Sequence, residues 1–162
     1  MRGAALRRLA AGLAGLWSGA MAGVAFIAAP TLFTVLPRAD AGRVASTLFE
    51  KDAYVGLAVG ALLLVVTMQR ARVDAERGVG SRFSTDMILA LAALFCVVAG
   101  YFGVQPMIEA ARQGRGGLSF GALHGVSMAF FAGKLVAAST LAWRLTAEAA
   151  AKRPATAAAR TS

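Results

Sequence analysis

Apolar residues of the chain are concentrated in four runs, which are separated by charged segments. The runs cover about residues 9–29, 53–68, 85–104 and 120–143. A helix needs about 20 apolar residues to cross the hydrocarbon core of a bilayer. The second run is shorter, so it must extend into its flanks or lie in a locally thin membrane. The pattern predicts an all-α, polytopic membrane protein with four transmembrane helices in one bundle (residues 1–146), followed by a disordered cytoplasmic tail (147–162).

The segments between the runs predict how the spans begin and end. Proline removes a helix hydrogen bond, so the first span is expected to kink or end at Pro30, and the third to end at Pro106. Residues 38–54 are too charged to span, but their apolar residues recur every three or four positions. This spacing predicts a short interfacial helix in the first outer loop.

The first run has two interpretations. Arginines at positions 2, 7 and 8 followed by an apolar stretch resemble a signal peptide. The run is longer than a typical signal-peptide core, and Pro30 follows the obvious cleavage point after Ala29. We therefore expect an uncleaved first helix.

Composition agrees with a membrane protein. Hydrophobic residues make up 58% of the 162 residues, and the mean hydropathy is +0.65. The net charge of +9 comes from Lys and Arg between and beyond the runs, without the aromatic-interleaved basic patch of nucleic-acid binders. We expect the lipid bilayer, and no nucleic acid, as a partner.

The distribution of basic residues predicts the topology. Eleven lie on the side of the N-terminus, second loop and tail, and five lie in the first and third loops. Basic residues are enriched in cytoplasmic segments. This predicts a bacterial inner-membrane protein with both termini in the cytoplasm.

Small residues recur every four positions in three runs. They are Gly15, Gly19 and Gly23; Gly56 and Gly60; and Gly121, Gly125, Ala129, Gly133 and Ala137. Such faces let helices approach closely, either within one chain or between copies. A homo-oligomer is therefore a second expectation.

Polar residues in or beside the spans are the candidates for function. A polar pocket near the outer face is predicted from His124, Ser127, Gln105, Tyr54 and Lys134. His124 has a structural interpretation as an interhelical contact and a functional one as a ligand or proton acceptor.

Lys134 requires a separate explanation, since a lysine inside a span is costly. The sequence offers no obvious intramembrane carboxylate, because Asp52 and Asp86 stand at span ends. We expect Lys134 to snorkel or to contact backbone carbonyls. A proton-coupled carboxylate mechanism is disfavoured on the same ground.

Catalytic and cofactor chemistry has little support. With one histidine and one cysteine (Cys96, inside a run), neither a catalytic triad nor a zinc site can be assembled, so we expect no enzyme and no cofactor. The alternative is haem or copper held by His124 with Met128, one turn away.

Several motifs resemble a known family. AAPTLFTVLP (28–37), Gln105-Pro106-Met107 and FGALHGVS (120–127) are similar to those of the bacterial transmembrane-protein-205-like family, domain of unknown function 4149. The resemblance spans roughly residues 10–145 and implies four inner-membrane helices, with no settled activity. The sequence therefore predicts a non-enzymatic membrane protein that handles a small solute or supports a membrane complex.

Overall fold

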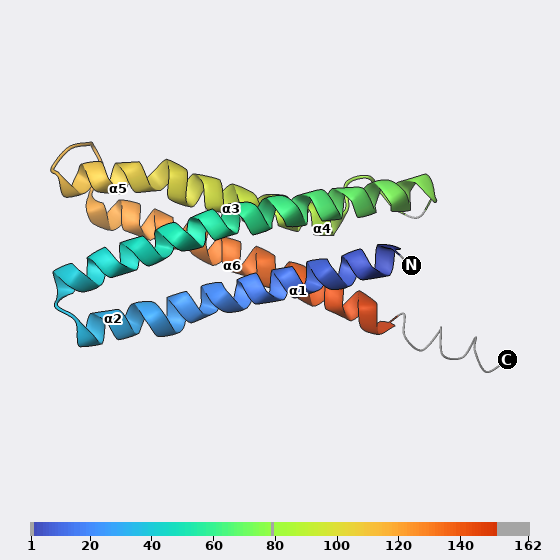
Figure 1. The fold of residues 1–162 in the computed structure, drawn as a ribbon. Helices are drawn as coiled ribbons and strands as arrows, with labels where there is room; N and C mark the ends of the chain where they lie inside the picture. The colour runs from blue at the N-terminus through green and yellow to red at the C-terminus, as the bar shows by residue number, and fades with distance from the viewer. Residues whose placement is uncertain (1, 79, 152–162) are drawn as a thin grey trace.

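Four long helical rods form the fold in the computed structural model, which describes residues 2–78 and 80–151 (Figure 1). The first rod contains α1 (Arg2–Gly23), a π-helical segment (Val24–Ala28) and α2 (Ala29–Val35). The second is α3 (Arg38–Glu76). The third contains α4 (Thr85–Val97), a second π-helical segment (Val98–Gly103) and α5 (Val104–Arg112), and the fourth is α6 (Phe120–Ala151).

All four rods are long and apolar enough to cross a membrane. The spans are Ala4–Val35, Arg38–Glu76, Thr85–Arg112 and Phe120–Glu148. Large apolar side chains point outward along them, among them Leu16, Phe26, Phe95 and Val136. In a bilayer this surface faces lipid, so the protein is a multi-pass membrane protein, as the sequence predicts.

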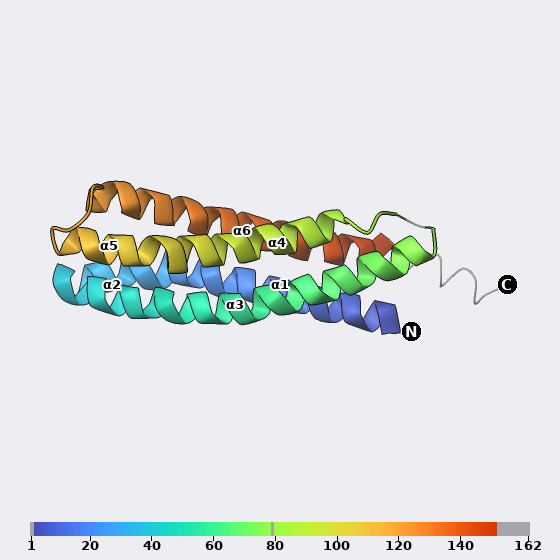
Figure 2. The same cartoon turned by 90° about the horizontal axis from the view of Figure 1, so that it is seen from above.

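The rods are arranged in a cycle. The first packs on α6, α6 on α4 and α5, α4 on α3, and α3 on the first rod. Figures 1 and 2 show the rods running side by side along one axis. In this cycle α3 and α6 lie diagonally across the bundle from one another.

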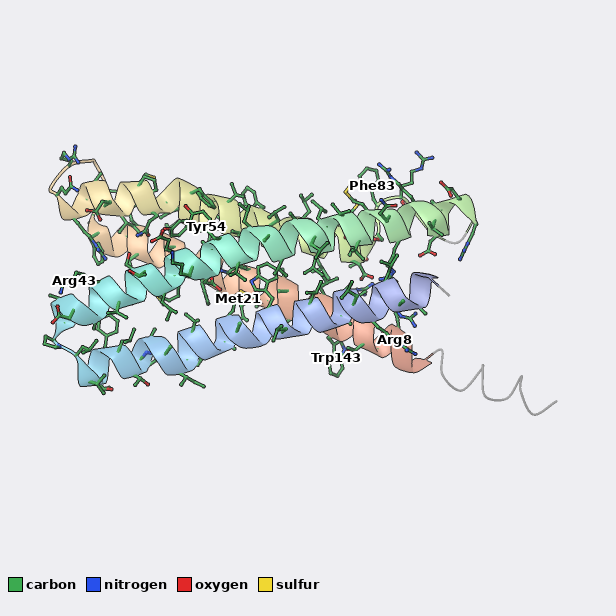
Figure 3. All side chains as sticks on the ribbon, viewed as in Figure 1. Arg8, Met21, Arg43, Tyr54, Phe83 and Trp143 are labelled. Atoms are coloured by element: carbon green, nitrogen blue, oxygen red, sulfur yellow. The ribbon has the colours of Figure 1, made fainter. Side chains whose placement is uncertain are left out.

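Two ends of the bundle are distinguished here by their connections. The basal end holds the start of α1, the connection 77–84 and the end of α6 (Figure 2). The distal end holds the connections 36–37 and 113–119. Arg8 and Phe83 are labelled near the basal end and Arg43 near the distal end in Figure 3.

Glycine and serine residues determine where the helices end and begin at the connections 77–84 and 113–119. Gly78 and Gly114 follow the ends of α3 and α5 with φ of 70° each, a left-handed conformation that glycine adopts without a Cβ clash. Ser84 caps α4 by accepting a hydrogen bond from the Met87 amide, 3.2 Å away. Ser119 does the same for the Ala122 amide at the start of α6.

The third span does not end at Pro106, which corrects that prediction, and the first span does not end at Pro30. Pro30 lies in the first turn of α2, and Pro106 lies in α5. Each follows a π-helical segment closed by a wider hydrogen bond, from the Ala29 amide to the Val24 carbonyl and from the Val104 amide to the Ala99 carbonyl. An extra residue in the turn is a known way to absorb a break in the helix ladder.

Two further boundaries differ from the prediction. Residues 38–54 are helical, but they form one continuous helix with the second span and not a separate interfacial helix. The fourth helix continues to Ala151, five residues into the predicted tail. The remaining tail residues, 152–162, lie outside the described part of the chain.

Candidate functional site

An ion pair joins α3 and α6 inside the bundle. The Nζ of Lys134 lies 2.5 Å from Oδ2 of Asp52, and the two side chains are only 6% and 8% exposed. Lys134 stands at the middle of its span, fourteen residues after Phe120 and fourteen before Glu148. Because α3 and α6 are diagonal in the cycle of rods, the pair crosses the interior of the bundle.

This contact corrects the prediction for Lys134. The sequence predicts snorkelling or carbonyl contact for Lys134, because Asp52 precedes the apolar run 53–68 and so stands at the end of that run. The helix containing Asp52 begins at Arg38, so this carboxylate is inside the helical bundle. Lys134 therefore has a carboxylate partner inside the bundle, contrary to the prediction.

Aromatic rings surround the lysine. Its Nζ lies 4.5 Å from the ring centroid of Phe131, one turn earlier on α6, at cation–π distance. The Phe131 ring meets Phe49 of α3 edge-on, with centroids 5.5 Å apart. A second diagonal contact between α3 and α6 therefore lies beside the ion pair and helps to exclude lipid and water from it.

Trp17 of α1 packs into a notch in α3 next to this pair. Its ring is 3% exposed, and a Cβ placed on Gly56 would lie 3.1 Å from its Cζ2 and 3.5 Å from its Nε1. Gly56 is one turn after Asp52 on the same face of α3. The Trp17 Nε1 is buried and has no hydrogen-bond partner in the described part of the chain.

α1 and α4 contribute further buried side chains to the interior of the bundle. Met21, one turn beyond Trp17, is fully buried in the same core cluster, and its label lies between α1 and α3 in Figure 3. Cys96 of α4 lies against Gly133, where a Cβ would be 3.4 Å from its Sγ. Gly133 directly precedes Lys134, so Cys96 brings α4 close to the ion pair.

The sequence contains one further signal that Asp52 lies inside the bundle. Asp52, Gly56 and Gly60 are four residues apart, so the acid shares the close-packing face of its helix. That spacing places the carboxylate toward the neighbouring helices. Which residue it meets there, 82 positions away, has no signal in one sequence.

The other predicted pocket residues are not brought together with Lys134. His124 is exposed and stacks on Phe120, one turn earlier on α6, with ring centroids 5.7 Å apart. Tyr54 is 52% exposed and meets the rings of Tyr101 and Phe102 edge-on. Gln105 and Ser127 are half-buried. Of the five predicted residues, Lys134 alone lies in the enclosed ion-pair site.

A second charged cluster closes the basal end. The carboxylate of Asp86, on α4, accepts a hydrogen bond from the Nε of Arg144 on α6, 2.8 Å away. It accepts a second one from the Nη1 of Arg70 on α3, 3.5 Å away. Arg70 also reaches Glu148 of α6 at 3.2 Å. These residues border a cleft of about 290 Å³ between the three helices. The cluster ties α3, α4 and α6 together at the basal end.

Metal ligands are scattered in the part of the chain that the structure describes. No group of three or more His, Cys, Asp or Glu side chains there could hold a metal ion. Met128, the suggested partner of His124, is exposed on α6. The haem or copper hypothesis stays a prediction, to be tested by an absorption spectrum and metal analysis of the purified protein.

Comparison with known proteins identifies the family. Residues 12–116, from α1 to the connection before α6, match the family described as domain of unknown function DUF4149. This match contains Trp17 and Asp52 and stops short of Lys134, so it covers less of the chain than the resemblance predicted from the sequence. No curated protein and no solved structure matches the chain. The chain belongs to the DUF4149 family.

Proposed function

We propose that this protein is a non-enzymatic protein of the bacterial inner membrane that handles a small ionic solute at the Lys134–Asp52 pair. Ionisable residues inside a membrane are costly and mark ion, proton or substrate pathways more often than they serve packing. The observation that carries the proposal is the burial of both charges in the middle of the bundle.

Energetics favour a functional role for this pair over a stabilising one. A buried ion pair gains little over apolar residues of similar volume, because removing both charges from water costs as much as their attraction returns. A bundle held only for stability could fill this position with leucine and phenylalanine. A charged pair enclosed by four helices instead provides a site where an ion can exchange partners.

The orientation is part of the same proposal. The basal end carries most of the basic residues outside the spans, and the start of α1 and the end of α6 both lie there (Figure 1). Cytoplasmic basal connections and an outward distal end follow from the preference of basic segments for the cytoplasm.

Reconstitution in liposomes tests the function. Vesicles containing a trapped pH-sensitive dye would be exposed to gradients of sodium chloride, sodium nitrate or potassium gluconate. We expect faster internal pH change than in protein-free vesicles for at least one salt, and a return to the protein-free rate for Asp52→Asn.

The matched control is Asp40→Asn. Asp40 lies on the same helix and pairs with Arg43 at the exposed distal end. This variant is expected to behave as wild type. Ion movement equal to that of empty vesicles under all three gradients, or equal in wild type and Asp52→Asn, would overturn the proposal.

A further inference from the structure

The bundle has a packed basal half and a distal half that separates into two helix pairs. The buried residues of the main core cluster end at Met21 on the first rod and at Val97 on the third. A smaller cluster, made of Val104, Ile108 and Leu123, belongs to α5 and α6. Figure 1 shows α2 and the start of α3 diverging toward the distal end from α5 and the start of α6.

The first and third rods change neighbours at this boundary. In the basal half, α1 and α4 each pack on both α3 and α6. Beyond the π-helical segments, α2 continues on α3 and α5 continues on α6. Within the described chain, α2 no longer packs closely on α6, and α5 no longer packs closely on α3. Each of the two rods therefore leaves one of its two neighbours at its π-helical segment.

Burial along the first rod shows the same change. The core-facing residues of α1 between Ala10 and Met21 are at most 3% exposed. No residue from Val24 to Val35, a stretch that the structure describes in full, is buried. The rod therefore leaves the packed core just before its π-helical segment begins.

Both π-helical segments stand where a rod can bend. Val24–Ala28 and Val98–Gly103 each begin within three residues of the last buried core residue of their rod. Pro30 and Pro106 follow them, and a proline leaves one helix hydrogen bond unmade. π-helical turns and prolines are the usual positions of helix kinks. α2 and α5 are therefore each joined to the packed core through a local weakness in the helix.

The ion pair lies at the level of these segments. A Cβ on Gly56 of α3 would meet both Trp17 of α1 and Val97 of α4, so these three residues share one level of the bundle. Asp52 is four residues nearer the distal end, a rise of about 6 Å. On the third rod this level falls within the π-helical segment, and on the first rod it falls just before it.

The same pair links the two helix pairs. Lys134 of α6 reaches Asp52 of α3, and the rings of Phe131 and Phe49 meet beside them. Toward the distal end, no further ion pair or ring contact joins α2 or α3 to α5 or α6 in the described part of the chain. The charged pair therefore stands at the point from which the two helix pairs diverge.

We infer that α2 and α5 are hinged segments that open and close the distal approach to the Lys134–Asp52 pair. They swing about the π-helical segments between the arrangement described here and a closed one, in which α2 also packs on α6 and α5 also packs on α3. This inference rests on the proposed function and assigns the side from which the solute arrives. The packed core closes the basal side.

Distances between spin labels test the motion in liposomes. In a Cys96→Ser background, Thr34→Cys/Ala122→Cys reports α2 against α6, and Thr47→Cys/Met107→Cys reports α3 against α5. Arg8→Cys/Thr146→Cys, at the packed basal end, is the control. All six positions are exposed. We expect two distances for each distal pair and one for the control, measured by double electron–electron resonance.

Variants of the segments test the hinges themselves. A Cβ on Gly100 would lie 2.7 Å from the Cβ of Phe130, whereas a Cβ on Gly103 would meet nothing within 4 Å. Gly100→Ala should therefore change the ratio of the two α3–α5 distances at least twofold, and Gly103→Ala should leave it unchanged. Pro30→Ala, at an exposed position, restores an N–H and should reduce one of the two α2–α6 distances.

Reaction with a water-soluble maleimide tests the approach to the pair. Ser127 lies seven residues before Lys134 on nearly the same face of α6, and Ala138 lies one turn after it in the packed core. In the Cys96→Ser background and in cells whose outer membrane alone is permeable, Ser127→Cys should react at least tenfold faster than Ala138→Cys.

Three results would overturn the inference: one distance for both distal pairs, equal distances in Gly100→Ala and Gly103→Ala, or equal reaction of the two cysteines. The liposome measurement of ion movement separates this failure from that of the proposed function. Ion movement that depends on Asp52 in a bundle with one distal distance removes the hinges and leaves the function. Two distances without such movement remove the function and leave the motion.

Discussion

Trp17 of α1 lies in the notch that Gly56 leaves in α3, with its Cζ2 3.1 Å from the place where a Cβ would stand. A small residue at this position lets two backbones approach and lets a large ring enter the interface. Gly56 is one turn after Asp52 on the same face of α3, so this helix contact lies next to the position of the ion pair in the sequence of α3.

Gly56→Ala should therefore destabilise the bundle. Overpacking of a tight interior costs about 1–3 kcal/mol, because the added methyl presses on Trp17 and Val97. Unfolding in a mixed-detergent titration measures the change. Gly15→Ala is the matched control, since a Cβ there meets nothing within 4 Å. Equal stability of the two variants would show that the notch is not tightly filled.

Removing one charge of the ion pair should lower the free energy of unfolding more than removing both charges. Lys134→Met leaves the Asp52 charge buried without a partner, which typically costs about 3–5 kcal/mol. The double variant Asp52→Asn/Lys134→Met leaves no buried charge and should recover most of that loss. The exposed Arg43–Asp40 pair serves as comparison, because Arg43→Gln is expected to cost less than about 1 kcal/mol. A double variant as unstable as the single one would contradict this account of the pair.

The outward face of α1 is the proposed surface for a homo-oligomer. Gly15 and Gly19 are exposed, and an added Cβ at either position would meet nothing within the chain. We expect Gly15→Ile and Gly19→Ile to reduce cross-linked dimers in membranes several-fold without loss of folded protein, because bulky residues keep helices apart. Unchanged cross-linking would remove this face from the interface.

Labelling of single cysteines tests the proposed orientation. In a Cys96→Ser background, Arg72→Cys at the basal end should react with a membrane-impermeant maleimide only after the cells are opened. Ser119→Cys, in the distal connection, should react in cells whose outer membrane alone is permeable. The opposite pattern would reverse the orientation that the basic residues favour.

Much of the fold follows from the apolar runs, because a bilayer requires helices of this length and leaves few alternatives. Helix ends were harder to predict. Proline inside a helix usually kinks or breaks it, but here Pro30 and Pro106 each follow a π-helical segment that keeps the rod continuous. That response depends on packing against neighbouring rods, which one sequence does not display.

The candidate site was predictable only in part. Lys134 stood out because it is a charge in the middle of an apolar run. Asp52 did not, since it comes one residue before its run, and the helix that carries it is longer than the apolar pattern. His124 is a candidate site residue because it is the single histidine, but it stacks on Phe120 at the exposed distal end. Contacts between diagonal helices depend on how the rods are rotated, and that is a property of the whole bundle.

The most direct test of the central claim compares wild type with the neutral double variant Asp52→Asn/Lys134→Met in the dye-loaded liposomes. The variant removes the charges and keeps the volume of both side chains, so its fold can be checked by the same unfolding titration. The account predicts a folded protein whose ion movement is that of empty vesicles. Ion movement equal to wild type would contradict it and would make the Lys134–Asp52 pair a structural contact.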